Sequence, residues 1–343
     1  MSFEFIQKLP TPKEIKEKYP VPREALEIKE QKDMELRDIF MGKDDRFIVI
    51  VGPCSADNKE SVLEYVRKLG KLNKELEDKL FIIPRIYTNK PRTTGEGYKG
   101  MLHQPDPHKE PDTLKGLISI RDLHIKAVIE GGMICADEML YPENYRYLSD
   151  ILGYVAVGAR SVENQQHRLT VSGMEIPAGM KNPTSGDFSI MLNSVYAGQL
   201  GHNFIYRGWD VTTDGNELAH AIVRGSVNKY GMCYPNYHYE DLAKLYEMYI
   251  EKELDNPSCI VDANHANSGK HYKEQIRIVK EVLHSRSISE DLNKFVKGVM
   301  IESYIEEGAQ KIGDNEVFGK SITDPCLGWE DTEMLLREIA KRV

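Results

Sequence analysis

Eight short, almost uninterrupted apolar runs recur along the chain, and amphipathic stretches with a helical period separate most of them. Strands of this composition are buried on both faces, as is typical of a parallel sheet covered by its crossover helices. The runs are 47–51, 81–86, 133–139, 154–158, 176–181, 219–224, 259–263 and 298–301, and the helical stretches are 61–76, 114–130, 144–152, 239–253, 273–283 and 329–343. Eight strands alternating with helices predict an α/β fold, a closed (β/α)8 TIM barrel, since an open doubly wound sheet more often has about five to seven strands.

The first 46 residues differ from the rest, because four prolines interrupt a charged segment before one helix that begins near Pro22 and ends near Gly42. We therefore expect two parts, an N-terminal arm and helix at 1–46 and a catalytic barrel at 47–343. A short hairpin insertion is expected at 202–217, before the sixth strand. So short an arm cannot bury its own apolar side chains, and we expect it to contact another subunit in a homodimer or homotetramer.

Composition excludes several classes of protein. The net charge is −9 and no basic block interrupts the acidic balance, which argues against a nucleic-acid partner. No apolar run approaches the roughly 18 residues of a membrane span, and the N-terminus lacks the pattern of a secretory signal. The five cysteines are scattered without CxxC pairs, as in proteins of a reducing compartment. The sequence predicts a soluble cytoplasmic protein.

Two glycine motifs resemble nucleotide-binding loops but lack the required context. GEGYKG at 95–100 matches GxGxxG, yet a basic loop precedes it and prolines follow it, whereas a dinucleotide site needs a strand before the motif and a helix after it. Gly319-Lys320-Ser321 resembles the end of a P-loop, but Asp314 stands where the first glycine is required. Neither motif predicts a nucleotide site.

The residues suited to catalysis or ligand binding lie at the ends of the predicted strands. Catalytic residues of a barrel come from the carboxyl ends of several strands. Those ends provide Cys54, Arg85, the acidic pair Asp137 and Glu138, Arg160, Lys181, Arg224, His265 and Glu302, and the loop after Arg85 adds Lys90, Arg92, Thr93 and Thr94. Six basic side chains at one rim indicate anionic substrates, because Arg and Lys are the usual partners of phosphate and carboxylate. The alternative, surface cations paired with acids, applies more easily to any one of them than to all six.

A second set, Cys54, His265, Glu302 and Asp324, could converge on a metal ion. A thiolate, an imidazole and two carboxylates suit Mn²⁺, Fe²⁺, Co²⁺ or Zn²⁺ better than Mg²⁺ or Ca²⁺. Ligands so far apart in sequence form no motif, and the alternative remains open that Cys54 is a small core residue and that His265 caps a turn.

Five segments, with the charged final helix GWEDTE, carry a resemblance that covers nearly the whole chain. They are GPCS at 52–55, KPRTT at 90–94, GAR at 158–160, HANS at 265–268 and GKSITD at 319–324. Together they resemble the class I 3-deoxy-D-arabino-heptulosonate 7-phosphate (DAHP) synthases of the phenylalanine/tyrosine-regulated type. The resemblance implies a TIM-barrel transferase that condenses phosphoenolpyruvate with erythrose 4-phosphate and water and releases phosphate, as the first step of the shikimate pathway to the aromatic amino acids.

The resemblance also implies residue roles. Cys54, His265, Glu302 and Asp324 would bind one divalent metal ion. Arg85, Arg160, Lys181 and Arg224 would hold phosphoenolpyruvate, and Lys90, Arg92, Thr93 and Thr94 would hold erythrose 4-phosphate beside Asp324. The metal would polarise the aldehyde for attack by C3 of phosphoenolpyruvate, with Cys54 among the catalytic residues. Lys181 and His265 would move protons while Arg160 and Arg224 stabilise the departing phosphate.

Charge counting agrees with these roles. Two phosphates and a carboxylate bring about five negative charges. Six basic side chains and a dication, less three anionic ligands, leave about five positive charges, so substrates and site would roughly neutralise one another.

Three alternatives and two open points remain at this stage. A sister enzyme, 3-deoxy-manno-octulosonate 8-phosphate synthase, would use arabinose 5-phosphate, although the KPRTT segment argues against it. Lys181 could form a Schiff base, or the barrel could be a non-catalytic sugar-phosphate sensor. The sequence leaves open whether Asp137 or Glu138 is the acidic site residue after the third strand, and Glu175 stands where a small residue is expected in the inhibitor pocket of feedback-regulated members.

Overall fold

The computed structural model describes residues 2–92, 95–313 and 315–343, and its centre is an eight-stranded parallel sheet. The strands are β1 (Phe47–Gly52), β2 (Leu80–Pro84), β3 (Cys135–Glu138), β4 (Leu152–Val157), β5 (Ala178–Lys181), β8 (Ala219–Val223), β11 (Cys259–Asp262) and β12 (Val296–Glu302). Their order is β2-β1-β12-β11-β8-β5-β4-β3. The two outer strands meet through the parallel bridge Arg85–Ala136, where the Ile86 amide donates to the Ala136 carbonyl at 2.9 Å. The predicted (β/α)8 barrel is confirmed.

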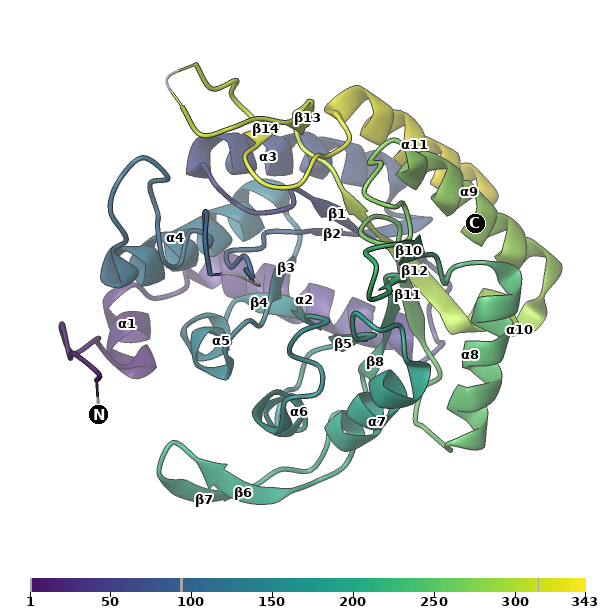
Figure 1. The fold of residues 1–343 in the computed structure, drawn as a ribbon, viewed down its shortest axis with the longest axis horizontal. Coiled ribbons are helices and arrows are strands. Elements are labelled where there is room, and N and C mark those ends of the chain that lie inside the picture. Colours follow the sequence, from purple (N-terminus) through teal and green to yellow (C-terminus); the bar gives the residue numbers. More distant parts are fainter. Residues whose placement is uncertain (1, 93–94, 314) are drawn as a thin grey trace.

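Helices surround the sheet on its outer side (Figure 1). They are α1 (Pro12–Lys18), α2 (Arg23–Phe40), α3 (Lys59–Leu76), α4 (Thr113–Gly131), α5 (Pro142–Leu148), α6 (Gln165–Val171), α7 (Phe188–Gln199), α8 (Tyr239–Glu251), α9 (Glu274–Ile288), α10 (Glu290–Phe295) and α11 (Trp329–Arg342). The sequence pattern does not reveal α6, α7 and α10. Helices α6 and α10 are only seven and six residues long, and α7 is apolar around most of its circumference, so its period is weak.

One predicted helix extends wrongly into the following strand. The stretch 144–152 was expected to be helical throughout, but α5 ends at Leu148 and Leu152 already begins β4, where it pairs with Cys135. Ile151 and Leu152 extend the apolar face of the helical pattern, so the sequence period cannot separate the two elements. Pairing with the neighbouring strand determines the outcome.

The N-terminal segment contains two helices, and the second one covers the amino-terminal end of the barrel, where it passes behind the strands in Figure 1. On α2, Leu36, Ile39 and Phe40 are buried in one cluster with Ile48 and Phe81. The apolar face of this helix is thus covered by the chain's own barrel. This corrects our reason for expecting the whole arm to need a partner subunit.

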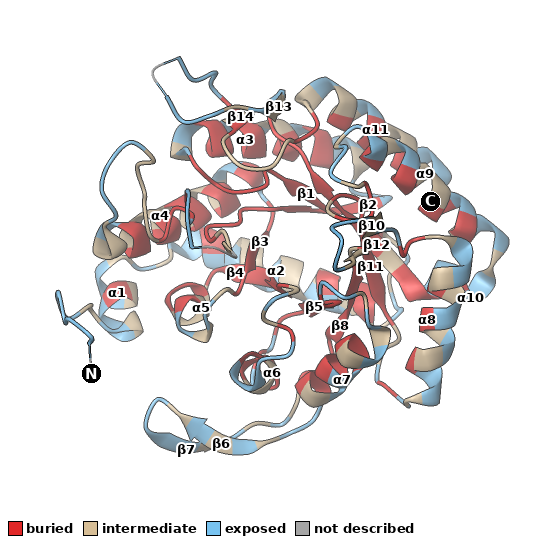
Figure 2. Ribbon diagram, in the orientation of Figure 1, coloured by how far each residue is buried: buried red, intermediate tan, exposed pale blue. Residues whose placement is uncertain are grey.

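The barrel core and the surface hairpins differ sharply in burial (Figure 2). Seven of the barrel strands are buried at every position, and β12 is buried at all but one. Short two-stranded pairs lie outside the barrel, formed by β6 (Asn203–Tyr206) with β7 (Trp209–Thr212), β9 (Ser226–Val227) with β10 (Cys233–Tyr234), and β13 (Glu306–Ala309) with β14 (Lys320–Ser321). The β6–β7 pair is the predicted hairpin before the sixth barrel strand. Among the described residues, no helix is long and apolar enough to cross a membrane.

We expect Leu36→Ala to destabilise the protein by about 3 kcal/mol, because a fully buried leucine loses its contacts and leaves a cavity under the barrel. The midpoint of urea unfolding measures this change. Leu26→Ala is the matched control on the same helix, since Leu26 is 45% exposed, and we expect it to cost less than about 1 kcal/mol. Equal effects of the two substitutions would show that α2 is not packed on the barrel as described.

Candidate active site

A cavity of about 370 Å³ opens at the carboxyl ends of the barrel strands. Closure of a parallel sheet brings all of these ends to one rim, whatever their distance along the sequence. The predicted residues that line this cavity are Cys54, Arg85, Lys90, Arg92, Arg160, Lys181, Arg224, His265 and Asp324. Glu302 ends β12 and is 1% exposed. Thr93 and Thr94 lie outside the described residues.

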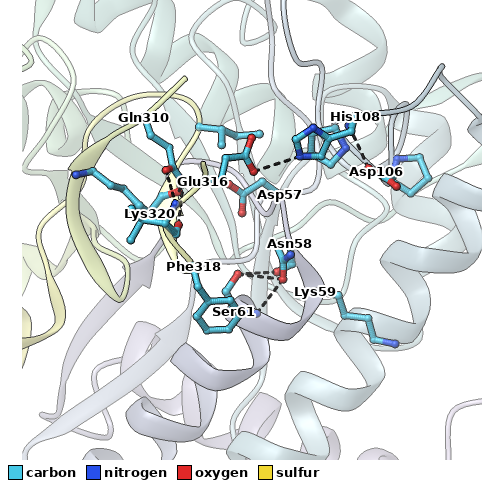
Figure 3. A pocket seen from close by; sticks show the side chains of 15 residues that line it. Asp57, Asn58, Lys59, Ser61, Asp106, His108, Gln310, Glu316, Phe318 and Lys320 are labelled. Atoms are coloured by element: carbon cyan, nitrogen blue, oxygen red, sulfur yellow. Dashed lines mark hydrogen bonds and ion pairs between the residues drawn. The ribbon is translucent and has the colours of Figure 1, made fainter. Parts of the chain in front are cut away.

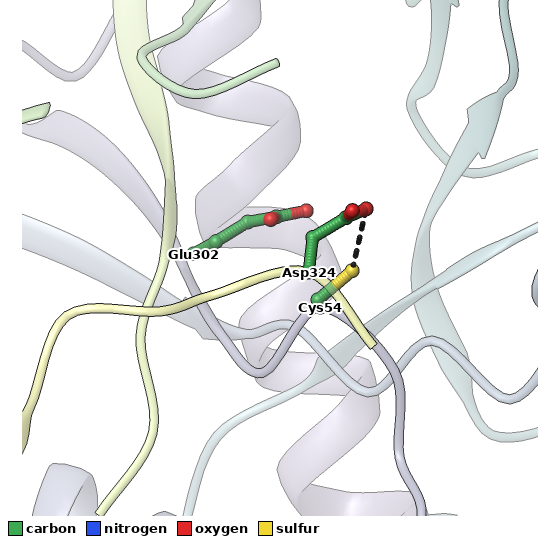
Figure 4. Close-up of side chains that lie close together, drawn as sticks. All are labelled: Cys54, Glu302 and Asp324. Carbon is green, nitrogen blue, oxygen red and sulfur yellow. Dashed lines mark hydrogen bonds between the residues drawn. The ribbon is translucent and has the colours of Figure 1, made fainter. Parts of the chain in front are cut away.

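A thiol and two carboxylates meet at one side of the cavity (Figure 4). Cys54, Glu302 and Asp324 each offer one atom, and these atoms lie within 4.8 Å of one another. The Lys90 Nζ atom lies 2.7 Å from Cys54 Sγ and 2.7 Å from Asp324 Oδ2. An ammonium group thus occupies the edge of a cluster whose donors suit a divalent ion that accepts both sulfur and oxygen. The residues present fit the metal that the resemblance implies.

The protonation of this cluster is uneven. Burial, reinforced by the charge of Glu302, raises the pKa of the Cys54 thiol to about 11. Burial also acts to raise the pKa of Asp324 and of Glu302, but the nearby Lys90 and Arg85, respectively, lower both below their ordinary values. At neutral pH the two carboxylates are ionised and the thiol keeps its proton. Metal binding at Cys54 would release that proton.

His265 lies beside this cluster but outside the group of mutually close atoms. Its Nε2 atom is 3.8 Å from Glu302 Oε1, and its Nδ1 atom is 2.8 Å from Asp262 Oδ2. A carboxylate behind a histidine fixes which ring nitrogen faces the opposite side. Its backbone φ of 50° lies in the left-handed region, which is uncommon for a residue with a side chain. Asp262 thus lies beside Nδ1 of the imidazole, and the Nε2 atom is on the side of Glu302.

The basic side of the cavity is only partly compensated. Arg85 donates to Glu302 at 2.9 Å and stacks on the Tyr87 ring at 3.8 Å, and Lys181 lies 3.2 Å from Asp262. By contrast, the buried Nη1 atom of Arg224 has no hydrogen-bond partner among the described residues, and burial lowers the pKa of this guanidinium. Unused donors of a buried cation are suited to a phosphate or carboxylate group.

The two acidic residues at the end of β3 point in different directions. Glu138 lines the cavity. Asp137 is 2% exposed and accepts hydrogen bonds from Thr88, with His124 behind it. The cavity-facing residue is therefore Glu138, which settles the register that the sequence leaves open.

Sequence reasoning missed Asp262 and Tyr87. Asp262 is the last residue of β11, but the apolar run extends to Ala263 and hides the strand end. Tyr87 lines the cavity between Arg85 and Lys181. Only its position two residues after Arg85, on the same side of an extended chain, could have indicated it.

Neither glycine motif leads into a helix. Residues 95–100 belong to the loop between β2 and α4, and Lys320 and Ser321 form β14. Among the described residues, neither segment has the strand–loop–helix arrangement of a nucleotide site.

A second cavity, of about 420 Å³, lies between the loop after β2 and the loop joining β13 to β14 (Figure 3). His108 and Glu316 bridge the two loops at 3.3 Å. Asp57, which also lines this cavity, is 5% exposed and accepts a hydrogen bond from the Tyr304 hydroxyl at 3.1 Å. Burial nevertheless raises the pKa of Asp57 to about 6.

Comparison with known proteins identifies relatives of the whole chain. The model of the DAHP synthetase I family matches residues 19–337. A phospho-2-dehydro-3-deoxyheptonate aldolase of Haemophilus influenzae is 37% identical over 341 residues, which span 95% of this chain and 89% of the relative. The Tyr-sensitive phospho-2-dehydro-3-deoxyheptonate aldolase of Escherichia coli strain K12 is 36% identical over 346 residues, which span 97% of this chain and 92% of that protein.

A solved structure has the same fold. The phospho-2-dehydro-3-deoxyheptonate aldolase of Francisella tularensis superposes with a TM-score of 0.91 at 30% sequence identity, over 100% of this chain and 98% of the other. The likeness covers the barrel and the N-terminal helices together.

We expect Asp57→Asn to stabilise the protein at pH 8 by up to about 3 kcal/mol and to have little effect near pH 4. The folded pKa of about 6 lies above the ordinary value, so the folded state binds this proton more tightly than the unfolded chain. The penalty of the ionised carboxylate therefore grows as the pH rises from about 4 to about 6 and is complete above that range. Urea unfolding at pH 4.5 and pH 8 measures the difference.

Asp150→Asn is the control of opposite sign. Burial acts to raise the pKa of Asp150, but Arg121, which it binds at 2.8 Å, lowers it overall. This substitution should destabilise the protein at pH 8. An Asp57→Asn protein no more stable than the parent at pH 8 would contradict the assignment.

Proposed function

The chain belongs to the DAHP synthetase I family, and we propose that its activity depends on a divalent metal bound by Cys54, His265, Glu302 and Asp324. The family reaction makes it a transferase that condenses phosphoenolpyruvate with erythrose 4-phosphate and water, giving DAHP and phosphate as the first step of aromatic amino acid biosynthesis. One observation carries the metal-dependent form of this activity. The Cys54, Glu302 and Asp324 donors converge within 4.8 Å at the side of a cavity whose lining also includes several Arg and Lys side chains.

The donor set narrows the choice of metal. A thiol between two carboxylates favours Mn²⁺, Fe²⁺, Co²⁺ or Zn²⁺. Held by these residues, the ion would supply Lewis acidity toward the sugar aldehyde. The role of His265 in this set is supported by the Asp262 carboxylate, which orients its ring toward Glu302.

Four cations that line the cavity, Arg85, Arg160, Lys181 and Arg224, are proposed to hold phosphoenolpyruvate. Arg85 and Lys181 are fixed by buried carboxylates, so their positions are set before substrate arrives. Arg224 contributes unused buried donors, and Arg160 lies at the exposed rim of the same cavity. These groups would bind the phosphate and carboxylate and stabilise the charge on the departing phosphate.

The opposite side of the cavity is proposed to hold erythrose 4-phosphate through Lys90 and Arg92, with Asp324, Thr93 and Thr94. Lys90 sits against Cys54 and Asp324, so it can reach both the metal cluster and an incoming sugar phosphate. C3 of phosphoenolpyruvate would then attack the aldehyde, water would add at C2, and phosphate would leave by C–O cleavage. Lys181 and His265, which share the Asp262 carboxylate, are the groups proposed to move protons.

The Schiff-base alternative is less well supported. A lysine nucleophile needs an uncharged amine. The Nζ atom of Lys181 donates to the fully buried Asp262 carboxylate at 3.2 Å, so it is already engaged in an ion pair. We therefore propose an electrostatic role for Lys181.

A cytoplasmic location is also proposed, supported by the absence of any disulfide among the five cysteines, all of which are described and free.

Chelator-treated protein should be inactive and should regain activity with Mn²⁺, and it should consume phosphoenolpyruvate with erythrose 4-phosphate but not with arabinose 5-phosphate. Loss of phosphoenolpyruvate absorbance measures both the dependence on Mn²⁺ and the choice of sugar phosphate. Turnover with the five-carbon sugar alone would assign the chain to the sister reaction. Full activity after complete metal removal would reject the metal-dependent mechanism.

Cys54→Ala should lower metal-restored turnover by at least about a thousandfold, since a metal ligand and its charge are lost. Cys135→Ala is the matched control, because Cys135 is also fully buried but lies in β3 away from the cavity. It should keep its metal content and its activity within about threefold. Metal content by mass spectrometry separates loss of metal from loss of fold.

We also propose that the protein is a homodimer or homotetramer. Ile205 and Trp209 on the β6–β7 hairpin are 83% and 74% exposed, and Phe3, Phe5 and Ile6 are exposed on the N-terminal segment. Large apolar side chains gathered on projecting segments are typical of an interface with another copy. These two segments are where the contact is proposed.

Light scattering should therefore give a mass of two or four times 39.2 kDa. Replacing Ile205 and Trp209 together by serine should lower that mass, because the apolar contact area is lost. Replacing the exposed Met334 of α11 by serine is the control and should leave it unchanged. A monomeric parent protein at micromolar concentration would contradict the proposal.

A further inference from the structure

The Asp137 carboxylate lies outside the cavity, yet it contacts two segments that lead into it. Asp137 ends β3 next to Glu138, which lines the cavity, and faces the opposite way, toward α4. Its exposed fraction is only 2%. A buried carboxylate is stable only where donors surround it, so its partners identify the parts of the chain that it holds together.

Both oxygens of Asp137 are occupied. Oδ1 accepts from the amide of Thr88 at 2.9 Å and from the amide of Glu138 at 2.7 Å. Oδ2 accepts from the Thr88 hydroxyl at 2.5 Å and lies 3.4 Å from Nε2 of His124. Nδ1 of His124 is buried without a partner among the described residues. The ring is therefore best satisfied as a donor through Nε2, and three elements converge on one carboxylate.

These hydrogen bonds lie at the junction of β2 and β3, where the barrel strands have the fewest backbone pairs. β2 and β3 are the two ends of the strand order, and within the described residues they meet through one bridge, Arg85–Ala136. Beyond that bridge the chain leaves β2 as the loop that carries the proposed sugar-phosphate cations. Thr88, three residues past the bridge, is the next point at which this segment is tied to the end of β3. At the start of the loop, the Asp137 side chain thus provides the hydrogen bonds that backbone pairing provides within the sheet.

The anchor at Thr88 is close to the reactive groups. Thr88 also accepts from the Leu102 amide at 3.1 Å through its carbonyl, and Lys90 donates its amide to the Lys99 carbonyl at 3.0 Å, so the two sides of the loop are joined just above the anchor. Lys90 follows Thr88 by two residues, which places its backbone within about 7 Å. A shift at Thr88 is therefore carried directly to the Lys90 ammonium beside Cys54 and Asp324.

We propose that Asp137 is a positioning residue for the sugar-phosphate side of the reaction, acting through Thr88 to hold Lys90 and Arg92 in place. The inference rests on the proposed function of these two cations. It assigns to Asp137 no contact with substrate. Because Arg85, Lys181 and Arg224 are held by other carboxylates or other strands, the phosphoenolpyruvate side does not depend on this anchor.

Thr88→Val tests the proposal most directly, because valine matches threonine in shape but lacks the hydroxyl that donates to Asp137. We expect the KM for erythrose 4-phosphate to rise about tenfold, while the KM for phosphoenolpyruvate and the metal content stay within twofold. Thr88→Ser keeps the hydroxyl and should behave like the parent. Asp137→Asn should raise the same KM, and adding Thr88→Val to it should raise the KM further by less than twofold, since both changes break one interaction.

Asp150→Asn supplies the structural control. It weakens the partly buried Arg121–Asp150 pair on the outside of the barrel, between α4 and the turn after α5, and touches no part of the loop. We expect it to lower the midpoint of urea unfolding without changing either KM. A readout based on KM therefore separates positioning from general loss of stability.

The outcomes distinguish failure of the positioning role of Asp137 from failure of the proposed function. Unchanged KM values in Thr88→Val and Asp137→Asn, or an equal rise in both KM values, would overturn the positioning role. The positioning role would also be overturned if Thr88→Val and Asp137→Asn lowered the midpoint of urea unfolding and kcat but left both KM values unchanged. Failure of the unaltered protein to consume erythrose 4-phosphate would instead reject the proposed function itself, before any variant is compared.

Discussion

Closure of the parallel sheet is the constraint on which the rest of the structure depends. A closed ring of parallel strands sends every carboxyl end to the same rim, so residues as distant in sequence as Cys54 and Asp324 come within 3.4 Å. No local motif could place a thiol, two carboxylates and several guanidinium groups together. The cavity is therefore a consequence of topology, and its chemistry is set by which residue types end the strands.

Once these charges share one small cavity, they must compensate one another. Arg85 pairs with Glu302, Lys181 pairs with Asp262, and Lys90 pairs with Asp324 across the cavity. Each pair holds a cation in place before substrate arrives, and the Arg85–Glu302 and Lys181–Asp262 pairs are almost fully buried. A site that stabilises transient negative charge requires such fixed cations. Arg224 differs from these three cations, because the part of the chain described here offers no hydrogen-bond partner for its buried Nη1 atom. The proposed phosphate of phosphoenolpyruvate would complete this pattern.

The sequence predicts strands and strand ends well and predicts side-chain direction poorly. Continuous apolar runs mark every barrel strand, because burial on both faces demands them, and the residues that follow them line the cavity. The pattern fails where two elements share one apolar face, as at Ile151 and Leu152, and where a helix is apolar all round, as in α7. It also fails at the Asp137–Glu138 pair, since both residues are acidic and only the pleat decides which one faces the cavity. The pairing of Lys90 with Cys54 depends on loop geometry that no periodicity encodes.

At the junction between β2 and β3 the chain is fixed to the neighbouring strand and yet turns away from the strand direction. Along the other junctions, ladders of backbone hydrogen bonds fix the strands at several registers, as between β1 and β12. At this junction one bridge is followed by a side-chain carboxylate that accepts from the Thr88 amide and hydroxyl. A side-chain anchor leaves the chain free to depart from the strand direction after Thr88, whereas a longer ladder would carry it straight on. The barrel can thus end β2 early, turn its chain over the cavity, and still fix the first residue of the loop that carries Lys90.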